Sequence, residues 1–120
     1  MDKKSTDELF NHHKALKTSH GDEGIALKLR LMFINDLPSQ LLKAKKLWQA
    51  NDYETLQSQL HHILGGAQVC AADGLIDCVN QIKFELRSSE VNKDRINQIW
   101  QEIDAINSAM QLSLKDTKNT

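Results

Sequence analysis

Two adjacent histidines, His61 and His62, lie within residues 52–70, where the spacing of apolar residues predicts one amphipathic helix. Each histidine is followed four residues later, one helical turn on, by a glycine: Gly65 after His61 and Gly66 after His62. A glycine inside a helix costs about 1 kcal/mol relative to alanine, so this pair indicates that something must approach the backbone beside a histidine. A neutral imidazole has a free ring nitrogen that can attack phosphorus, which makes phosphoryl chemistry the first reaction to consider.

The apolar spacing divides the predicted helix into a buried stripe and an edge. The buried stripe is predicted to consist of Leu56, Leu60, Ile63, Ala67 and Cys70. The second stripe, one residue round and expected to be open to solvent, consists of Gln57, His61, Leu64, Gly65 and Gln68. A phosphoryl acceptor needs an exposed ring on a rigid helix, small neighbours and a flat docking surface, because a partner can supply the metal ion and the donor phosphate. The second stripe meets these requirements and is the candidate site.

Other chemistries fit the sequence less well. Adjacent helical histidines point about 100° apart and cannot chelate one ion, and only Glu8 and His12 form a histidine–carboxylate pair one turn apart. We therefore predict no metal site and no cofactor. The chain has neither the Gly-x-Ser-x-Gly turn of a nucleophilic hydrolase nor the Gly-x-x-x-x-Gly-Lys loop that binds ATP.

Length and composition favour a single domain covering residues 1–120. Aromatic residues make up 5% and there is one proline, which suits a helical bundle better than a β-sandwich. The formal net charge of −1 argues against a nucleic-acid-binding protein, which normally needs a clustered basic surface. No apolar run is long enough to span a membrane, and the N-terminus lacks a signal-peptide core. Cys70 and Cys78 are too few for a disulfide scaffold and are predicted to be reduced core thiols of a cytoplasmic protein.

Helical periodicity continues along the chain, and no segment alternates with the period of a strand. We predict an all-α fold, an antiparallel up-and-down four-helix bundle with an additional short N-terminal helix. The ends, residues 1–4 and 115–120, are expected to be mobile. In chain order, the predicted helices are a short one carrying Leu9, Phe10, His13 and Leu16, a long one from Ile25 to Trp48, the central one from Asp52 to about Ala71, one from Asp73 through Leu86, and a last one carrying Ile96, Ile99, Ile103, Ile106, Met110 and Leu114.

Breakers and caps set the boundaries of these helices. Gly21 is predicted to end the first helix. Pro38 lies inside the long helix and must end or kink it near Asp36. Side-chain caps are predicted at Ser5 or Thr6, at Asp22 and at Asp52.

Beyond these patterns, the run from Leu31 to Leu86 resembles the histidine-containing phosphotransfer (Hpt) domain of bacterial multistep two-component phosphorelays. It looks closest to the Hpt domains at the C-terminal ends of tripartite hybrid sensor kinases. The residues that match the family pattern are Phe33, Leu37-Pro38, Asn51-Asp52-Tyr53, Leu56, His61, Ile63 and Gly65, followed by apolar residues at Ala67, Leu75, Val79 and Ile82. The resemblance implies a four-helix bundle with the phosphorylated histidine projecting from its middle.

The resemblance also bears on which histidine is the acceptor. The spacing of the surrounding residues matches the family only when His61 takes that role. On a helical wheel, His62 lies about 200° from Leu60, far from the core and without packing to fix its ring. Both arguments favour His61. Gly65 would then let a receiver domain come close, while Gly66 occupies a position that is usually small in the family.

Two positions depart from the family pattern. Three residues after the acceptor, where the family commonly has lysine, the chain has Leu64, and at position +22, where glutamate or glutamine is frequent, it has Lys83. We hypothesise that Lys83 supplies the positive charge that Leu64 cannot; the alternative is a solvated surface lysine. Gln57 and Gln68 lie one turn before and two turns after His61, and either is a candidate donor to phosphate oxygens, with the nearer Gln57 favoured.

The resemblance implies that His61 accepts a phosphoryl group from the aspartyl phosphate of a receiver domain and passes it to a response regulator. The implied partners are response-regulator receivers and the receiver of a hybrid sensor kinase, docking around His61, Leu64 and Gly65 through a small interface. Mg²⁺ is expected on the receiver, and the chain is expected to be a monomer without kinase activity. The alternative function is a helical docking module that binds a receiver without phosphotransfer; a kinase dimerisation domain is disfavoured because no ATP-binding part is present.

Overall fold

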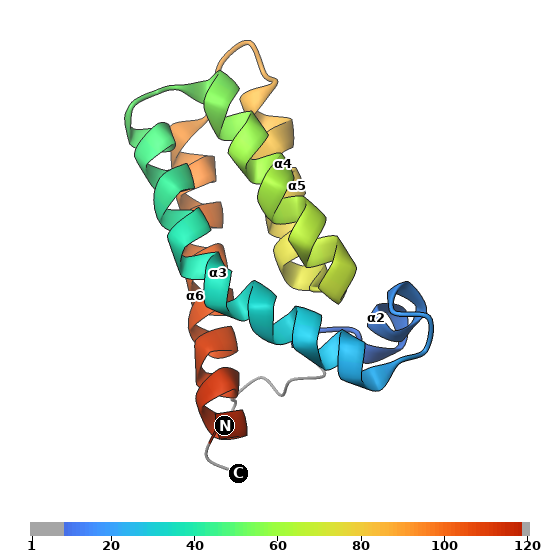
Figure 1. Cartoon of the computed structure of the whole chain (residues 1–120). Helices are drawn as coiled ribbons and strands as arrows, with labels where there is room; N and C mark the ends of the chain where they lie inside the picture. Colours follow the sequence, from blue (N-terminus) through green and yellow to red (C-terminus); the bar gives the residue numbers. More distant parts are fainter. Residues whose placement is uncertain (1–8, 119–120) are drawn as a thin grey trace.

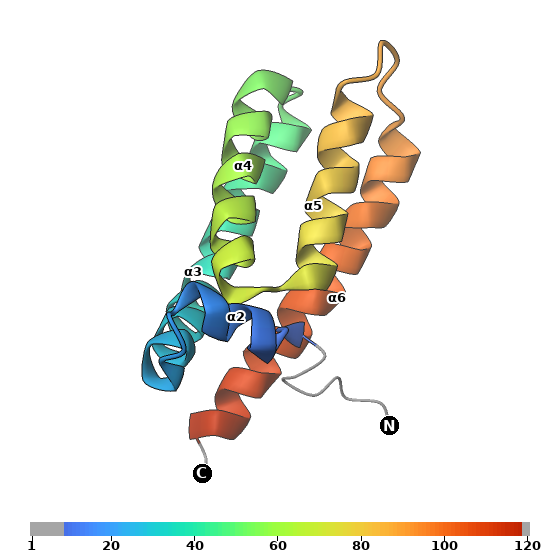
Figure 2. The ribbon, with the colours of Figure 1, turned by 90° about the vertical axis from the view of Figure 1, so that its right-hand side faces the viewer.

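The computed structural model describes the backbone of residues 9–118 and the side chains of residues 9–114. Its helices are α2 (His12–Thr18), α3 (Glu23–Gln49), α4 (Tyr53–Cys70), α5 (Asp73–Leu86) and α6 (Lys93–Lys118), shown in Figure 1. The four long helices run up and down in turn and pack as a bundle, and the short α2 lies near one end of it (Figure 2). The described part of the chain contains no strand, so the predicted all-α bundle with a short additional helix is confirmed.

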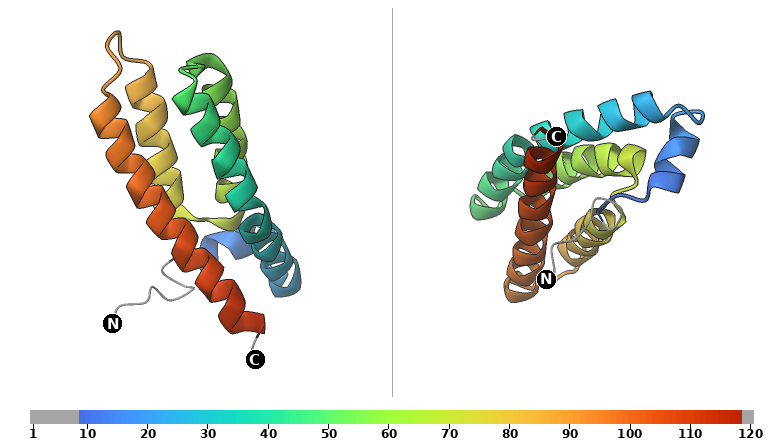
Figure 3. Two further views of the ribbon diagram at one scale, coloured as in Figure 1. Left: turned by 90° about the vertical axis from the view of Figure 1, so that its left-hand side faces the viewer. Right: turned by 90° about the horizontal axis from the view of Figure 1, so that it is seen from below.

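Pro38 shapes α3. Because proline has no N–H, the carbonyl of Ile34 loses the helical donor it would otherwise have four residues later. That carbonyl instead accepts a hydrogen bond of 2.9 Å from Nε2 of Gln111 on α6. The helix continues through Pro38 but bends part-way along (Figure 1), as the sequence predicted. The bend carries the N-terminal part of α3 across the end of the bundle toward α2, and α6 packs against both α3 and α5 (Figure 3).

The predicted helix boundaries around α3 and α4 are confirmed by their caps. Gly21 has φ = 80° and donates its N–H to the carbonyl of Leu16, which ends α2. The Asp22 carboxylate accepts a hydrogen bond from the Ile25 N–H at 3.0 Å, and the Asp52 carboxylate accepts one from the Thr55 N–H at 3.2 Å. The central helix is therefore fixed at its start by its own sequence.

The first helix differs from its prediction. A helix running through Leu9, Phe10, His13 and Leu16 is wrong, because the chain leaves helical geometry at Phe10 and Asn11. Asn11 caps α2 by accepting a hydrogen bond from Lys14 N–H, and its own N–H donates to the Ala71 carbonyl at 2.8 Å. The predicted caps at Ser5 and Thr6 lie outside the described residues.

At the other end of the chain, α6 extends to Lys118. The polar tail that was expected to begin at Lys115 is therefore in part the last turn of this helix. Ser88 and Ser89 lie in the connection between α5 and α6, and Asn92 caps α6 by accepting a hydrogen bond from Arg95 N–H at 3.0 Å.

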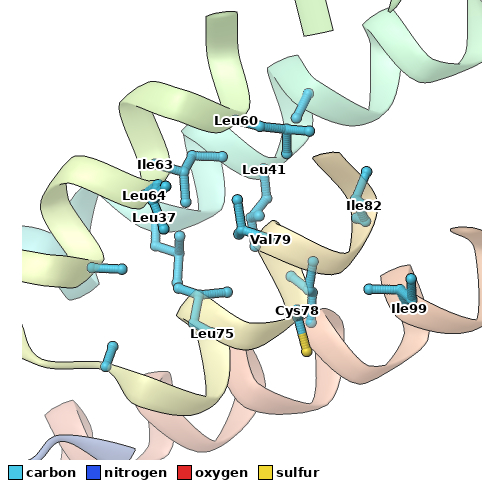
Figure 4. Close-up of a cluster of buried hydrophobic side chains, with 14 of the residues drawn as sticks. Leu37, Leu41, Leu60, Ile63, Leu64, Leu75, Cys78, Val79, Ile82 and Ile99 are labelled. Atoms are coloured by element: carbon cyan, nitrogen blue, oxygen red, sulfur yellow. The ribbon is translucent and has the colours of Figure 1, made fainter. Parts of the chain in front are cut away.

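Side chains from the four long helices meet in one core (Figure 4), where labelled residues of α4 point toward those of α3 and α5. Cys70 and Cys78 are buried and are not joined in a disulfide, as predicted. Burial raises the pKa of the Cys70 thiol to about 11, an effect that the charge of Arg30 partly offsets. None of the described helices is long and apolar enough to cross a membrane. The buried residues of α4 are Leu56, Leu60, Ile63, Leu64, Ala67 and Cys70.

Candidate functional site

The adjacent histidines lie on the exposed surface of α4, which packs against α3 on one side and α5 on the other. Their rings project in different directions, because successive helical residues are turned by about 100°. His62 lines a hollow with residues of α3, so it lies on the α3 side of α4. His61 is therefore turned toward the side where α5 packs. A shift of one residue thus places the two candidates on opposite flanks of one helix.

The hollow beside His62 has a volume of about 400 Å³. Nε2 of Gln59 donates a hydrogen bond of 3.5 Å to the backbone carbonyl of Gln40 across it. His62 was predicted to lie far from the core, without packing to fix its ring; it is exposed and borders this polar hollow. The residues that line the hollow are Asp36, Ser39, Gln40, Lys43, Gln59 and His62.

The two glycines that follow the histidines have different surroundings. A β-carbon added at Gly66 would lie 2.9 Å from Cδ1 and 3.1 Å from Cε1 of Phe33, so α3 approaches α4 too closely for a side chain there. A β-carbon added at Gly65 would meet nothing within 4 Å. Packing inside the bundle therefore explains Gly66, while Gly65 faces open space one turn from His61.

Leu64 is not where the sequence analysis put it. It was expected at the solvent-open edge, but only 7% of it is exposed and it belongs to the core. The reason is that Leu64 lies one turn from both Leu60 and Ala67, so the buried face of α4 is wider than the predicted stripe and includes it. Figure 4 shows Leu64 among the buried side chains of the core. Leu64 therefore cannot provide the apolar docking surface predicted for it.

Lys83 lies half-buried on α5. The connection between α4 and α5 is only Ala71 and Ala72, and the two helices run antiparallel from it (Figure 2). His61 comes ten residues before Ala71 and Lys83 eleven residues after Ala72, so the equal rise of the two helices puts them at nearly the same height. On the same flank of α4 as His61, Gln57 is half-buried and Gln68 is exposed. By helix geometry, Gln57, Gly65 and Gln68 share a flank of α4 with His61, and Lys83 lies at nearly the same level on the neighbouring helix.

Three residues near this surface were missed by the sequence analysis. Met32 is 55% exposed and Val69 36% exposed. Met32 is next to Phe33 on α3, and Val69 lies near the end of α4, one turn after Gly65. The exposed apolar side chains near Gly65 therefore come from both helices. Arg87, the exposed C-cap residue that follows α5, comes four residues after Lys83 and adds a second positive charge at this end of the helix. The i, i+4 spacing of Lys83 and Arg87 was a usable sequence signal, whereas the exposure of Met32 depends on the bend in α3.

Among the described residues, no group of three or more histidine, cysteine, aspartate or glutamate side chains is arranged to hold a metal ion. His12 approaches Glu23, with its Nε2 atom 3.4 Å from Oε1. That contact joins α2 to the start of α3. Glu8, the carboxylate one turn before His12 in the sequence, lies outside the described residues.

The chain was compared with models of protein families, and the model described as the Hpt domain matches residues 28–109. The match covers more than half of the chain and includes the whole of α4 and α5. The chain belongs to the Hpt family. No curated protein and no solved structure matched it. Membership of the Hpt family implies histidine phosphotransfer in phosphorelay signalling, in which Hpt domains are phosphotransfer intermediates rather than kinases and typically interact with receiver domains.

Proposed function

We propose that this Hpt domain accepts a phosphoryl group on His61 from the aspartyl phosphate of a receiver domain and passes it to a response regulator. The observation that carries the choice of His61 is the open space at Gly65, one turn away on the same face, which lets a receiver approach the helix. Gly66, four residues after His62, is explained by its close contact with Phe33 inside the bundle, so it does not favour His62 as the acceptor.

The reaction requires few groups from this chain. A ring nitrogen of His61 attacks phosphorus in line with the aspartyl oxygen; the N–P bond forms as the O–P bond breaks, and aspartate leaves as a carboxylate. The receiver carries the Mg²⁺ that neutralises the phosphate during transfer. Lys83, at the height of His61 on α5, supplies the positive charge that leucine at position 64 does not, and Gln57 is the favoured hydrogen-bond donor to the phosphoryl oxygens.

We propose that the domain acts as a monomer. The two cysteines are buried and are not joined in a disulfide, which fits a reducing compartment, and we place the protein in the cytoplasm. The donor is proposed to be the receiver of a hybrid sensor kinase or of a response regulator, contacting His61, Gly65 and the exposed Met32 and Val69. An interface of this size gives a transient complex.

A second candidate function is docking of a receiver without phosphotransfer. The observation that favours it is Leu64, which replaces the family lysine and is buried, so no charge stands at that position. The two functions share a binding surface and differ only in whether phosphohistidine forms.

The test is transfer from a phosphorylated receiver domain, with Mg²⁺, to the wild type and to the His61→Gln and His62→Gln variants. We expect acid-labile, base-stable label on the wild type and on His62→Gln, and none on His61→Gln. Label lost only in His62→Gln would move the acceptor to the other flank of α4. A wild type that binds receivers but takes no label would support docking without transfer.

A further inference from the structure

Phe84 is an exposed aromatic residue on the outer face of α5. With 70% of it exposed, it is more exposed than any other large apolar side chain among the described residues. The core residues of α5 are complete without it, since Leu75, Val79 and Ile82 are buried on the opposite side. Folding therefore gives no reason for an aromatic residue at this position. An exposed aromatic side chain with a polar rim is the usual form of an anchor in a protein–protein interface.

The rim around Phe84 is polar and partly acidic. Phe84 borders a surface hollow of about 440 Å³ between α5 and α6. Asp77 lies seven residues before Phe84, on the same face of the helix, and Glu85 is next to it. Arg95, which also borders the hollow, donates from Nη2 to Oε1 of Gln81 at 2.8 Å. The residues that line the hollow are Asp77, Asn80, Gln81, Phe84, Glu85 and Arg95.

This hollow fits a basic side chain. A lysine or arginine entering it would place its charge near two carboxylates and its methylene groups or guanidinium plane against an aromatic ring. Because Arg95 already donates to Gln81, one positive charge stands against the two negative charges of the lining. The lining therefore carries one net negative charge from Asp77 and Glu85, and Lys83 and Arg87, on either side of Phe84, lie outside it.

The hollow lies on α5, the helix that packs beside the α4 helix of His61. Phe84 directly follows Lys83, whose place along α5 corresponds to that of His61 along α4, so Phe84 stands on the neighbouring helix at nearly the same level as the proposed acceptor. A receiver of ordinary interface size, about 800 Å² on each partner, covers a surface wider than two packed helices. A partner seated over His61 and extending across α5 therefore reaches Phe84.

We propose that Phe84, together with Asp77 and Glu85, anchors a lysine or arginine side chain of the docked receiver domain and so selects among receivers; the inference rests on the proposed function. The anchor contacts the partner but not the reacting atoms. It therefore acts on the affinity of the complex and leaves the rate of transfer within the complex unchanged.

The test uses a panel of receiver domains phosphorylated by acetyl phosphate in the presence of Mg²⁺. Binding is measured by fluorescence anisotropy of the labelled receiver, and transfer is measured as a function of receiver concentration. Phe84→Ala is expected to raise the Kd by about tenfold while the transfer rate at saturation stays the same. The matched control is Leu42→Ala, because Leu42 is a 57% exposed apolar residue on α3, away from this hollow. The combined Asp77→Asn and Glu85→Gln variant is expected to raise the Kd by about fivefold and to weaken its dependence on salt.

A Phe84→Ala variant that binds receivers as tightly as Leu42→Ala would overturn the proposal that Phe84 is an anchor. An unchanged salt dependence of the Kd in the Asp77→Asn, Glu85→Gln variant would overturn the proposal that the anchored side chain is basic. The proposed function can fail separately. If the wild type binds receivers without taking label, the Kd still tests Phe84, and a weaker complex with Phe84→Ala supports the anchor. Absence of binding to every receiver would overturn both.

Discussion

A histidine followed four residues later by a glycine occurs twice on α4, in two registers one residue apart: His61 with Gly65, and His62 with Gly66. Each set also has a lysine on a neighbouring helix: Lys83 on α5 at the height of His61, and Lys43 on α3 in the hollow beside His62. The surroundings nevertheless differ. In the His62 register, Gly66 packs closely against Phe33 of α3. In the His61 register, Gly65 faces open space. The comparison shows that a rotation of about 100° along a helix separates a packing position from an accessible one.

The largest expected difference between the two registers is in stability. Gly66→Leu should lower the free energy of unfolding by about 3 kcal/mol, because the added side chain must displace the buried ring of Phe33. Gly65→Leu, its matched control, adds a side chain to open space and should not destabilise the fold. Urea unfolding of both variants makes the comparison. Equal midpoints for the two would show that the Phe33 contact imposes no constraint.

The contact can be tested further in a Phe33→Leu background. There the cost of Gly66→Ala should shrink, because the two substitutions share one contact and are not additive.

The lysine variants of the two registers should differ by less than the glycine variants do. Lys83→Ala should slow phosphotransfer or shorten the lifetime of phosphohistidine by about fivefold, the effect of one partly exposed charge on a phosphate. Lys43→Ala should leave both unchanged, because Lys43 faces the other histidine. Transfer time courses with a phosphorylated receiver give both quantities. Equal behaviour of the two variants would make Lys83 a solvated surface lysine.

The smallest effect is expected from Gly65→Ala. The added methyl group meets nothing within 4 Å, so the helix should gain up to about 1 kcal/mol of stability. The same methyl group stands where a receiver approaches, and the Kd for the receiver should rise. Thermal unfolding and receiver binding, measured on one preparation, give the two results together. A variant that is more stable and binds receivers as well as the wild type would remove the docking argument for Gly65.

Most of the fold was predictable because its signals are local. The Asp22 and Asp52 caps, the stop at Gly21 and the bend at Pro38 each depend on residues within one turn. The first helix was misplaced for the opposite reason. Asn11 is held by the carbonyl of Ala71, and nothing near Asn11 in the sequence indicates that contact. The position of Leu64 was also misjudged, because a single helix cannot show how wide a face its neighbours will bury.

The sequence by itself determined the helices, the pair of histidines with glycines one turn on, and the resemblance to the Hpt family. These follow from residue type and spacing along one segment. Only the tertiary structure decided which glycine is required by packing, that Leu64 is buried, that Lys83 is level with His61, and that Phe84 is exposed beside Asp77 and Glu85. Each of these depends on where a second helix lies, and that is set by how the apolar faces of all the helices fit together in one core.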